Sequence, residues 1–123
     1  MASVLVIEDE PALRRMLTFT LRDAGFDVRT AWNGVEGLQQ VDAAIPDVIV
    51  LDLEMPVMDG RTFYHRLRER GLRTPVCILS AYGARKAQRE LEAEASVQKP
   101  FGSDDLIDKL RDLVGGDGVA SRA

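Results

Sequence analysis

Short apolar runs alternate with helical patterns along the chain. Val4–Ile7, Asp47–Leu51 and Val76–Leu79 are nearly continuous runs of aliphatic residues, which is typical of parallel strands covered on both faces. Phe26–Ala31 is more polar, which favours a strand at an edge of the sheet, and Ser96–Gln98 is short. The pattern therefore predicts five strands.

The segments between these runs carry apolar residues at helical spacing. These residues are Leu13, Met16, Leu17 and Leu21, then Val35, Leu38 and Val41, then Phe63, Tyr64 and Leu67, and finally Leu106, Ile107, Leu110 and Leu113. Ala84–Ala95 is rich in Ala, Glu and Arg and is also expected to be helical, with Leu91 as its only large aliphatic residue. Strict alternation of strands and helices predicts an α/β fold, a doubly wound parallel sheet with five helices on its two faces.

The length of the chain, 123 residues, suits one domain. We predict that this domain occupies residues 1–114 and that residues 115–123, a Gly-containing end, form a flexible tail or the start of a linker. Such a tail is too short for an output domain. We therefore expect output through another protein or through an effector domain outside this sequence.

Charge and composition narrow the functional classes. Lys and Arg number 16 against 20 Asp and Glu, a net charge of −4, which argues against nucleic-acid or membrane binding as the main activity. The chain has one cysteine, Cys77, and one histidine, His65, which excludes a multi-Cys zinc site and a His-rich metal centre. We find no signal peptide or spanning segment, and Cys77 in an apolar run favours the cytoplasm.

The polar residues of interest follow the predicted strands. Glu8 and Asp9 follow the first strand, Asp52 the third, Ser80 the fourth and Lys99 the fifth. Because parallel strands end at one edge of a sheet, and ligands bind there, we expect these side chains to converge. Clustered carboxylates need a cation to balance them, and an oxygen-only cluster suits Mg²⁺. Asp52 could then act as a nucleophile on phosphorus.

The motifs that hold these residues resemble a known family. They are Val6-Ile7-Glu8-Asp9-Glu10, Leu51-Asp52-Leu53-Glu54-Met55-Pro56 with Met58-Asp59-Gly60, Ser80-Ala81, and Lys99-Pro100-Phe101. In this order they look like the receiver domain of two-component response regulators. The resemblance covers nearly the whole chain and implies a flavodoxin-like, five-stranded parallel sheet in the order 2-1-3-4-5.

The resemblance also implies roles in phosphorelay signalling. Asp52 would accept a phosphoryl group from a sensor histidine kinase or a phosphotransfer protein, and Ser80 would be the switch hydroxyl that moves toward it. Lys99, before a cis bond to Pro100, would bind the phosphoryl group. The protein would be a switch rather than an enzyme, with only self-catalysed phosphotransfer and autodephosphorylation.

A metal site is implied by the same resemblance. Glu8, Asp9 and Asp52, with the backbone carbonyl of Glu54, would hold Mg²⁺, for which Mn²⁺ can substitute. The partners would be the kinase or phosphotransfer protein and a downstream protein, with no direct binding to nucleic acid or membrane. The resemblance does not decide whether the protein forms a homodimer.

Three departures from the family pattern lie close together. Ser96 stands where members carry an aromatic residue, Glu94-Ala95 replaces a common Gly-Ala pair, and only 19 positions separate Ser80 from Lys99. We therefore expect a shortened fourth-helix region and an unusual route of output, with Tyr82 as a candidate for the missing ring.

Two other functions remain open on the sequence alone. The first is a receiver-like binding module that is not phosphorylated, which the departures mildly favour and the intact acidic pair, acceptor and lysine disfavour. The second is a phosphatase with an aspartyl-phosphate intermediate, but such haloacid-dehalogenase-like enzymes carry a second Asp where this chain has Glu54.

Overall fold

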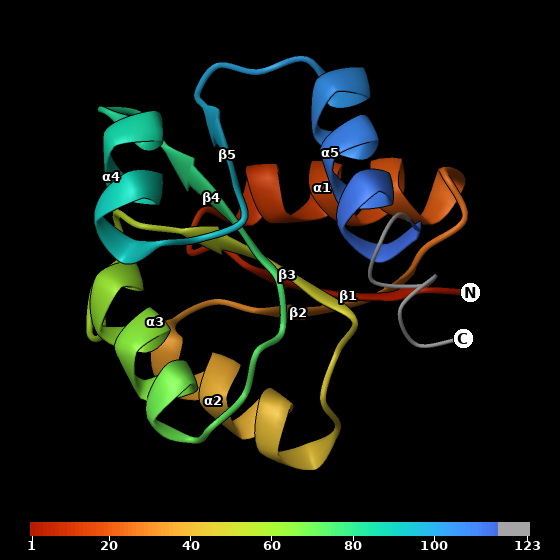
Figure 1. Cartoon of the computed structure of the whole chain (residues 1–123). Coiled ribbons are helices and arrows are strands. Elements are labelled where there is room, and N and C mark those ends of the chain that lie inside the picture. The colour runs from red at the N-terminus through yellow and green to blue at the C-terminus, as the bar shows by residue number, and fades with distance from the viewer. Residues whose placement is uncertain (116–123) are drawn as a thin grey trace.

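Five parallel strands form one sheet in the order β2-β1-β3-β4-β5 (Figure 1). The computed structural model describes residues 1–115. Its strands are β1 (Ser3–Ile7), β2 (Asp27–Ala31), β3 (Val48–Asp52), β4 (Val76–Ser80) and β5 (Ala95–Gln98), and its helices are α1 (Pro11–Asp23), α2 (Gly34–Ala43), α3 (Gly60–Glu69), α4 (Ala84–Leu91) and α5 (Ser103–Gly115). The predicted fold class, strand number and strand order are confirmed.

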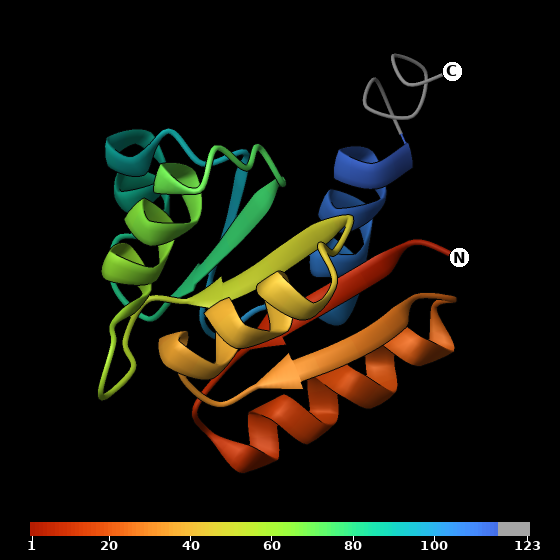
Figure 2. The same ribbon diagram turned by 90° about the horizontal axis from the view of Figure 1, so that it is seen from below.

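The helices cover both faces of the sheet, as Figure 2 shows. Alternate residues of β1 divide between the two faces: Leu5 and Ile7 pack with α2, α3 and α4, whereas Val4 and Val6 pack with α1 and α5. Burial on both faces explains why β1, β3 and β4 read as continuous apolar runs. The polar strand β2 lies at an edge of the sheet, as predicted.

The fourth helix is shorter than its composition predicts. α4 ends at Leu91 instead of continuing to Ala95, because Glu92 adopts a left-handed backbone conformation with φ 59°. The chain then turns directly into β5. The shortened fourth-helix region expected from the spacing of Ser80 and Lys99 is therefore a helix of 8 residues.

Two smaller predictions concern the end of the chain and the core. The predicted tail lies outside the described residues, except Gly115, which ends α5. Cys77 is fully buried within β4, and burial raises the pKa of its thiol to about 12, which suits a residue of the core. Among residues 1–115, we find no helix with the length and apolar character needed to cross a membrane.

Candidate functional site

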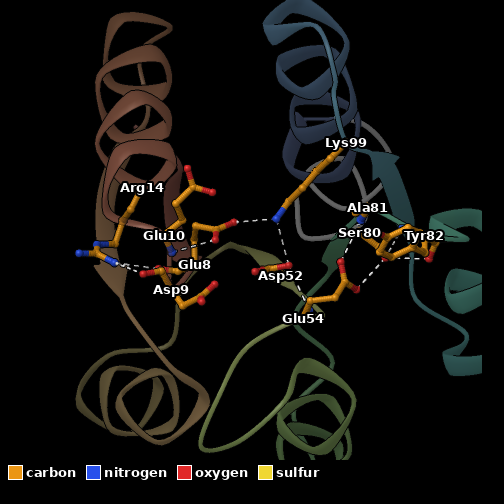
Figure 3. A network of polar contacts seen from close by, with 10 residues as sticks. All are labelled: Glu8, Asp9, Glu10, Arg14, Asp52, Glu54, Ser80, Ala81, Tyr82 and Lys99. Atoms are coloured by element: carbon orange, nitrogen blue, oxygen red, sulfur yellow. Dashed lines mark hydrogen bonds and ion pairs between the residues drawn. The ribbon is translucent and has the colours of Figure 1, made fainter.

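The predicted site residues meet at the carboxyl edge of the sheet (Figure 3). Asp52 is the last residue of β3 and Ser80 is the last residue of β4, while Glu8 directly follows β1. Lys99 directly follows β5, and its side chain reaches back across the edge toward the carboxylates. The parallel topology thus places groups from four strands in one small region.

Asp52 lies fully buried at the centre of this region. Its Oδ1 accepts hydrogen bonds from the backbone N–H of Glu54 (3.2 Å) and from Lys99 Nζ (3.2 Å). Its Oδ2 is buried and has no hydrogen-bond partner. A buried carboxylate oxygen without a partner is costly, so Oδ2 is the atom of this side chain that is available to a cation or a reacting group.

Glu8 and Asp9 complete an acidic cluster beside Asp52. Glu8 is fully buried, and its Oε2 accepts a hydrogen bond from the backbone N–H of Glu10 (3.1 Å). Its Oε1 forms an ion pair with Lys99 Nζ at 3.3 Å but makes no hydrogen bond. One carboxylate oxygen from each of Glu8, Asp9 and Asp52 lies within 4.8 Å of the others.

This cluster fits a hard divalent cation. Mg²⁺ takes oxygen ligands and is commonly held by one or two carboxylates with several waters, and two of the three carboxylates here each present a buried oxygen that accepts no hydrogen bond. Asp9 is only half-buried, so the cluster is open to solvent on its side. The carbonyl of Glu54 as a further ligand stays a prediction.

Burial and like charge perturb the pKa values of the cluster. Burial, reinforced by the negative charge of Glu8, raises the pKa of Asp52 to about 7, although the Lys99 ammonium opposes the shift. Burial also raises the pKa of Glu8, against the Glu10 N–H and Lys99. Burial disfavours the charge on Lys99, but Asp52 and Glu8 outweigh it and raise the pKa of Lys99. One ammonium therefore balances two buried carboxylates incompletely.

Ser80 is connected to the site through Glu54, which the sequence did not predict. The Ser80 side chain is fully buried, and its hydroxyl lies 2.8 Å from Glu54 Oε2 and 2.8 Å from the carbonyl oxygen of Tyr82. Glu54 Oε1 accepts a hydrogen bond from the backbone N–H of Ala81 (2.9 Å). The position of Glu54, two residues after Asp52, was visible in the sequence, but the direction of its side chain was not.

Two further residues shape the site. Gly60 belongs to the Met58-Asp59-Gly60 motif of the family resemblance, whereas Arg14 had no sequence signal that we recognised. Arg14 of α1 donates hydrogen bonds to the backbone carbonyls of Glu8 (2.9 Å) and Asp9 (3.3 Å), which fixes the turn that carries the acidic pair. Gly60 lies against the end of β3, where a Cβ atom would come within 2.5 Å of the carbonyl oxygen of Asp52. Only glycine fits that approach, since real Cβ contacts of this length do not occur.

The three departures from the family pattern have a structural counterpart. Ser96 donates a hydrogen bond to Gln88 of α4 (2.6 Å), and Glu94 accepts a hydrogen bond from the backbone N–H of Val76 (2.8 Å). The first contact joins β5 to α4, and the second joins the residue before β5 to the first residue of β4. Tyr82 is 82% exposed, and its role as a substitute for the missing ring stays a prediction.

Comparison with known proteins places this site in a family context. The sequence model of the response regulator receiver domain family matches residues 4–111 of this chain. The chain is 35% identical over 114 residues to the transcriptional regulatory protein TrcR of Mycobacterium tuberculosis, a match that covers 90% of this chain and 44% of that protein. The chain spans about half the length of the curated relatives it matches.

Solved structures show the same fold. The receiver domain of the Francisella response regulator 1452 superposes with a TM-score of 0.87 at 31% identity, covering 93% of this chain and 97% of that one. The response regulator TrrA of Thermotoga maritima, solved in complex with Mg²⁺-BeF, gives 0.84 at 32% identity, covering 92% and 99%. Since the family match takes in the five strands, apart from the first residue of β1, and every residue of the acidic edge, the chain belongs to the response regulator receiver domain family, which functions in two-component phosphorelay signalling.

Proposed function

We propose that Asp52 accepts a phosphoryl group from a phosphohistidine of a sensor histidine kinase or phosphotransfer protein. The observation that carries this proposal is the surroundings of Asp52: a buried carboxylate with Oδ2 unpartnered, between two acidic residues and the Lys99 ammonium. A structural carboxylate of the core would have both oxygens satisfied.

The two carboxylate oxygens of Asp52 have different roles in the phosphoryl transfer. Oδ1 is held by the Glu54 N–H and by Lys99, so Oδ2 attacks phosphorus. The new P–O bond forms as the P–N bond to the donor imidazole breaks, and the imidazole nitrogen keeps the electron pair. Lys99 then lies beside the phosphoryl group, which carries about −1.5 to −2 charges, and balances part of them.

A divalent cation held by Glu8, Asp9 and Asp52 would neutralise charge on the phosphoryl oxygens. The chain itself needs such help, because the pKa of Asp52 is raised to about 7 while the attacking carboxylate must be ionised. A nearby cation favours the ionised form. We therefore propose that Mg²⁺ is required for phosphorylation and that Mn²⁺ can replace it.

The partners are proposed from the surface and from the relatives. A cavity of about 410 Å³ lies beside Lys99 and is lined by Leu13, Met16 and Phe101 among others, which suits an apolar helix of the phosphodonor. A larger cavity of about 620 Å³ on α1 and β2 contains no residue of the acidic cluster.

TrcR is a transcriptional regulator more than twice as long as the matched segment, so we propose output through an effector domain or a separate protein.

The decisive experiment is phosphorylation by a small donor. The protein is incubated with Mg²⁺ and phosphoramidate or acetyl phosphate, and its intact mass is measured beside Asp52→Asn and the exposed control Asp108→Asn. One added phosphoryl group in wild type and Asp108→Asn, but not in Asp52→Asn, supports the proposal. A chain that gains no phosphoryl group would instead be a binding module, and rapid hydrolysis of phosphomonoesters would identify a phosphatase.

A further inference from the structure

The side chain of Glu54 binds two adjacent donors at the end of β4. Its Oε2 lies 2.8 Å from the Ser80 hydroxyl, and its Oε1 lies 2.9 Å from the backbone nitrogen of Ala81. Figure 3 shows this side chain at the same edge as Asp52, extending to Ser80 and Ala81. Each carboxylate oxygen is therefore engaged by a different donor.

The hydroxyl of Ser80 has one proton and two acceptors within reach. Glu54 Oε2 and the carbonyl oxygen of Tyr82 both lie at 2.8 Å, while the backbone N–H of Tyr82 donates to Ser80 Oγ (3.1 Å). A hydroxyl donates only one hydrogen bond, and an ionised carboxylate is a stronger acceptor than a carbonyl. Glu54 is therefore the preferred acceptor, and it orients the hydroxyl.

The same two donors come directly after the strand partner of Asp52. In the β3–β4 ladder Asp52 pairs with Leu79, so Ser80 and Ala81 are the next residues of the chain beside it. Glu54 is also tied to the acceptor, since its N–H donates to Asp52 Oδ1 (3.2 Å). A phosphoryl group on Asp52 and the Glu54 carboxylate would therefore seek the same hydroxyl and the same N–H.

We propose that Glu54 is an internal ligand that competes with the phosphoryl group for Ser80 and Ala81. Before phosphorylation its carboxylate occupies both donors, and afterwards the phosphoryl group displaces it. The inference rests on the proposed function of Asp52, and it makes Glu54 a positioning residue that sets how strongly the switch favours its unphosphorylated state.

The charges require such a displacement. A phosphoryl group brings about −1.5 to −2 charges, and like charges that share one set of donors repel. The Glu54 side chain is exposed at the surface, so it can rotate into solvent without opening the core. Ser80 is fully buried and must exchange one anionic acceptor for another.

The test compares wild type with Glu54→Gln and Glu54→Ala, using beryllofluoride with Mg²⁺ as the probe for a phosphoryl group. Glu69→Gln is the matched control, because Glu69 is an exposed carboxylate at the last residue of α3. Binding is measured by calorimetry. We expect Glu54→Ala to bind beryllofluoride about tenfold more tightly than wild type, the net effect of removing the two competing hydrogen bonds of Glu54, one part-buried and one exposed. Glu54→Gln, which keeps one acceptor oxygen, should show a smaller gain, and Glu69→Gln none.

Two additional measurements separate competition from a general change of charge. In the metal-free protein, the amide proton resonance of Ala81 should shift in Glu54→Ala and not in Glu69→Gln. In a Ser80→Ala background the gain from Glu54→Ala should shrink, because one of the contested donors is gone.

The outcomes distinguish this proposal from the one on which it rests. If wild type gains no phosphoryl group and binds no beryllofluoride, the proposed function fails and this inference fails with it. If wild type binds the probe while Glu54→Ala binds it equally or more weakly, Asp52 keeps its role and the competition is wrong. An unchanged Ala81 amide in Glu54→Ala likewise overturns the inference.

Discussion

Replacing Asp52 by Asn removes a buried negative charge while keeping the size of the side chain. Without a divalent cation, burial and the charge of Glu8 raise the pKa of Asp52 to about 7, against the effect of Lys99. The folded protein then holds a proton on Asp52 that the unfolded chain releases near pH 4. Because Asp52 binds more protons in the folded state in this range, its contribution to the stability of the wild type falls as the pH rises from about 4 to about 7.

The size of this effect follows from the shift. A pKa change from the ordinary 3.8 to about 7 corresponds to about 4 kcal/mol when the carboxyl is fully ionised. The Asn side chain can still accept hydrogen bonds from Glu54 N–H and Lys99, which keeps Glu8 as an ion-pair partner. We therefore expect Asp52→Asn to raise the free energy of unfolding by about 2 to 4 kcal/mol at pH 8.

Urea denaturation followed by circular dichroism, in the presence of a chelator, measures this difference at pH 5 and pH 8. At pH 5 the advantage of Asp52→Asn should be less than half of its value at pH 8, because Asp52 is then protonated in the folded wild type. Asp108→Asn, which changes an exposed carboxylate, should show no such trend. Equal stability of wild type and Asp52→Asn at pH 8, or an advantage that does not change with pH, would refute the electrostatic reasoning.

Three further predictions concern the metal and the loop after β3. Mg²⁺ at a hundredfold excess over its Kd should stabilise the wild type by about 2.7 kcal/mol, which is measured as a rise in melting temperature. Asp9→Asn should lose most of this rise, and an equal rise in both proteins would exclude Asp9 as a ligand. Gly60→Ala should lower the urea midpoint by an amount equivalent to about 1 to 3 kcal/mol. The new Cβ would lie 2.5 Å from the Asp52 carbonyl oxygen and 2.7 Å from Leu53 Cα. An unchanged urea midpoint would contradict this packing. Val57→Asn should raise the urea midpoint by the equivalent of about 1 kcal/mol. Val57 has φ 70° and is exposed, and Asn tolerates this conformation better than a β-branched residue. A lower urea midpoint would show that the Val57 side chain makes a compensating contact.

The end of α4 is set by contacts that are distant in the sequence. Ala84–Ala95 has helical composition throughout, yet Glu92 turns left-handed and its carbonyl accepts a hydrogen bond from the Tyr64 hydroxyl of α3 (3.2 Å). Glu94 is held by the Val76 N–H. These partners are 18 to 28 positions away in the chain, so local propensity contains no information about them.

The order of residues along the chain is enough to predict the fold and the residues of the acidic edge. Continuous apolar runs marked the strands buried on both faces, and the polar run of β2 marked an edge. In a parallel sheet all strands end on one side, so the position of Asp52 or Lys99 after its strand was enough to bring them together. Strand order was implied by the family resemblance and is confirmed by the structure.

The partners of the side chains at that edge depend on the folded arrangement of the strands. This arrangement left Asp52 Oδ2 without a partner, placed one ammonium against two buried carboxylates, and turned Glu54 toward Ser80 and Ala81. The physical reason is that a strand end fixes where a residue lies, through local periodicity and parallel topology. The orientation of its side chain depends on donors and charges supplied by other strands, which come together only when the chain has folded.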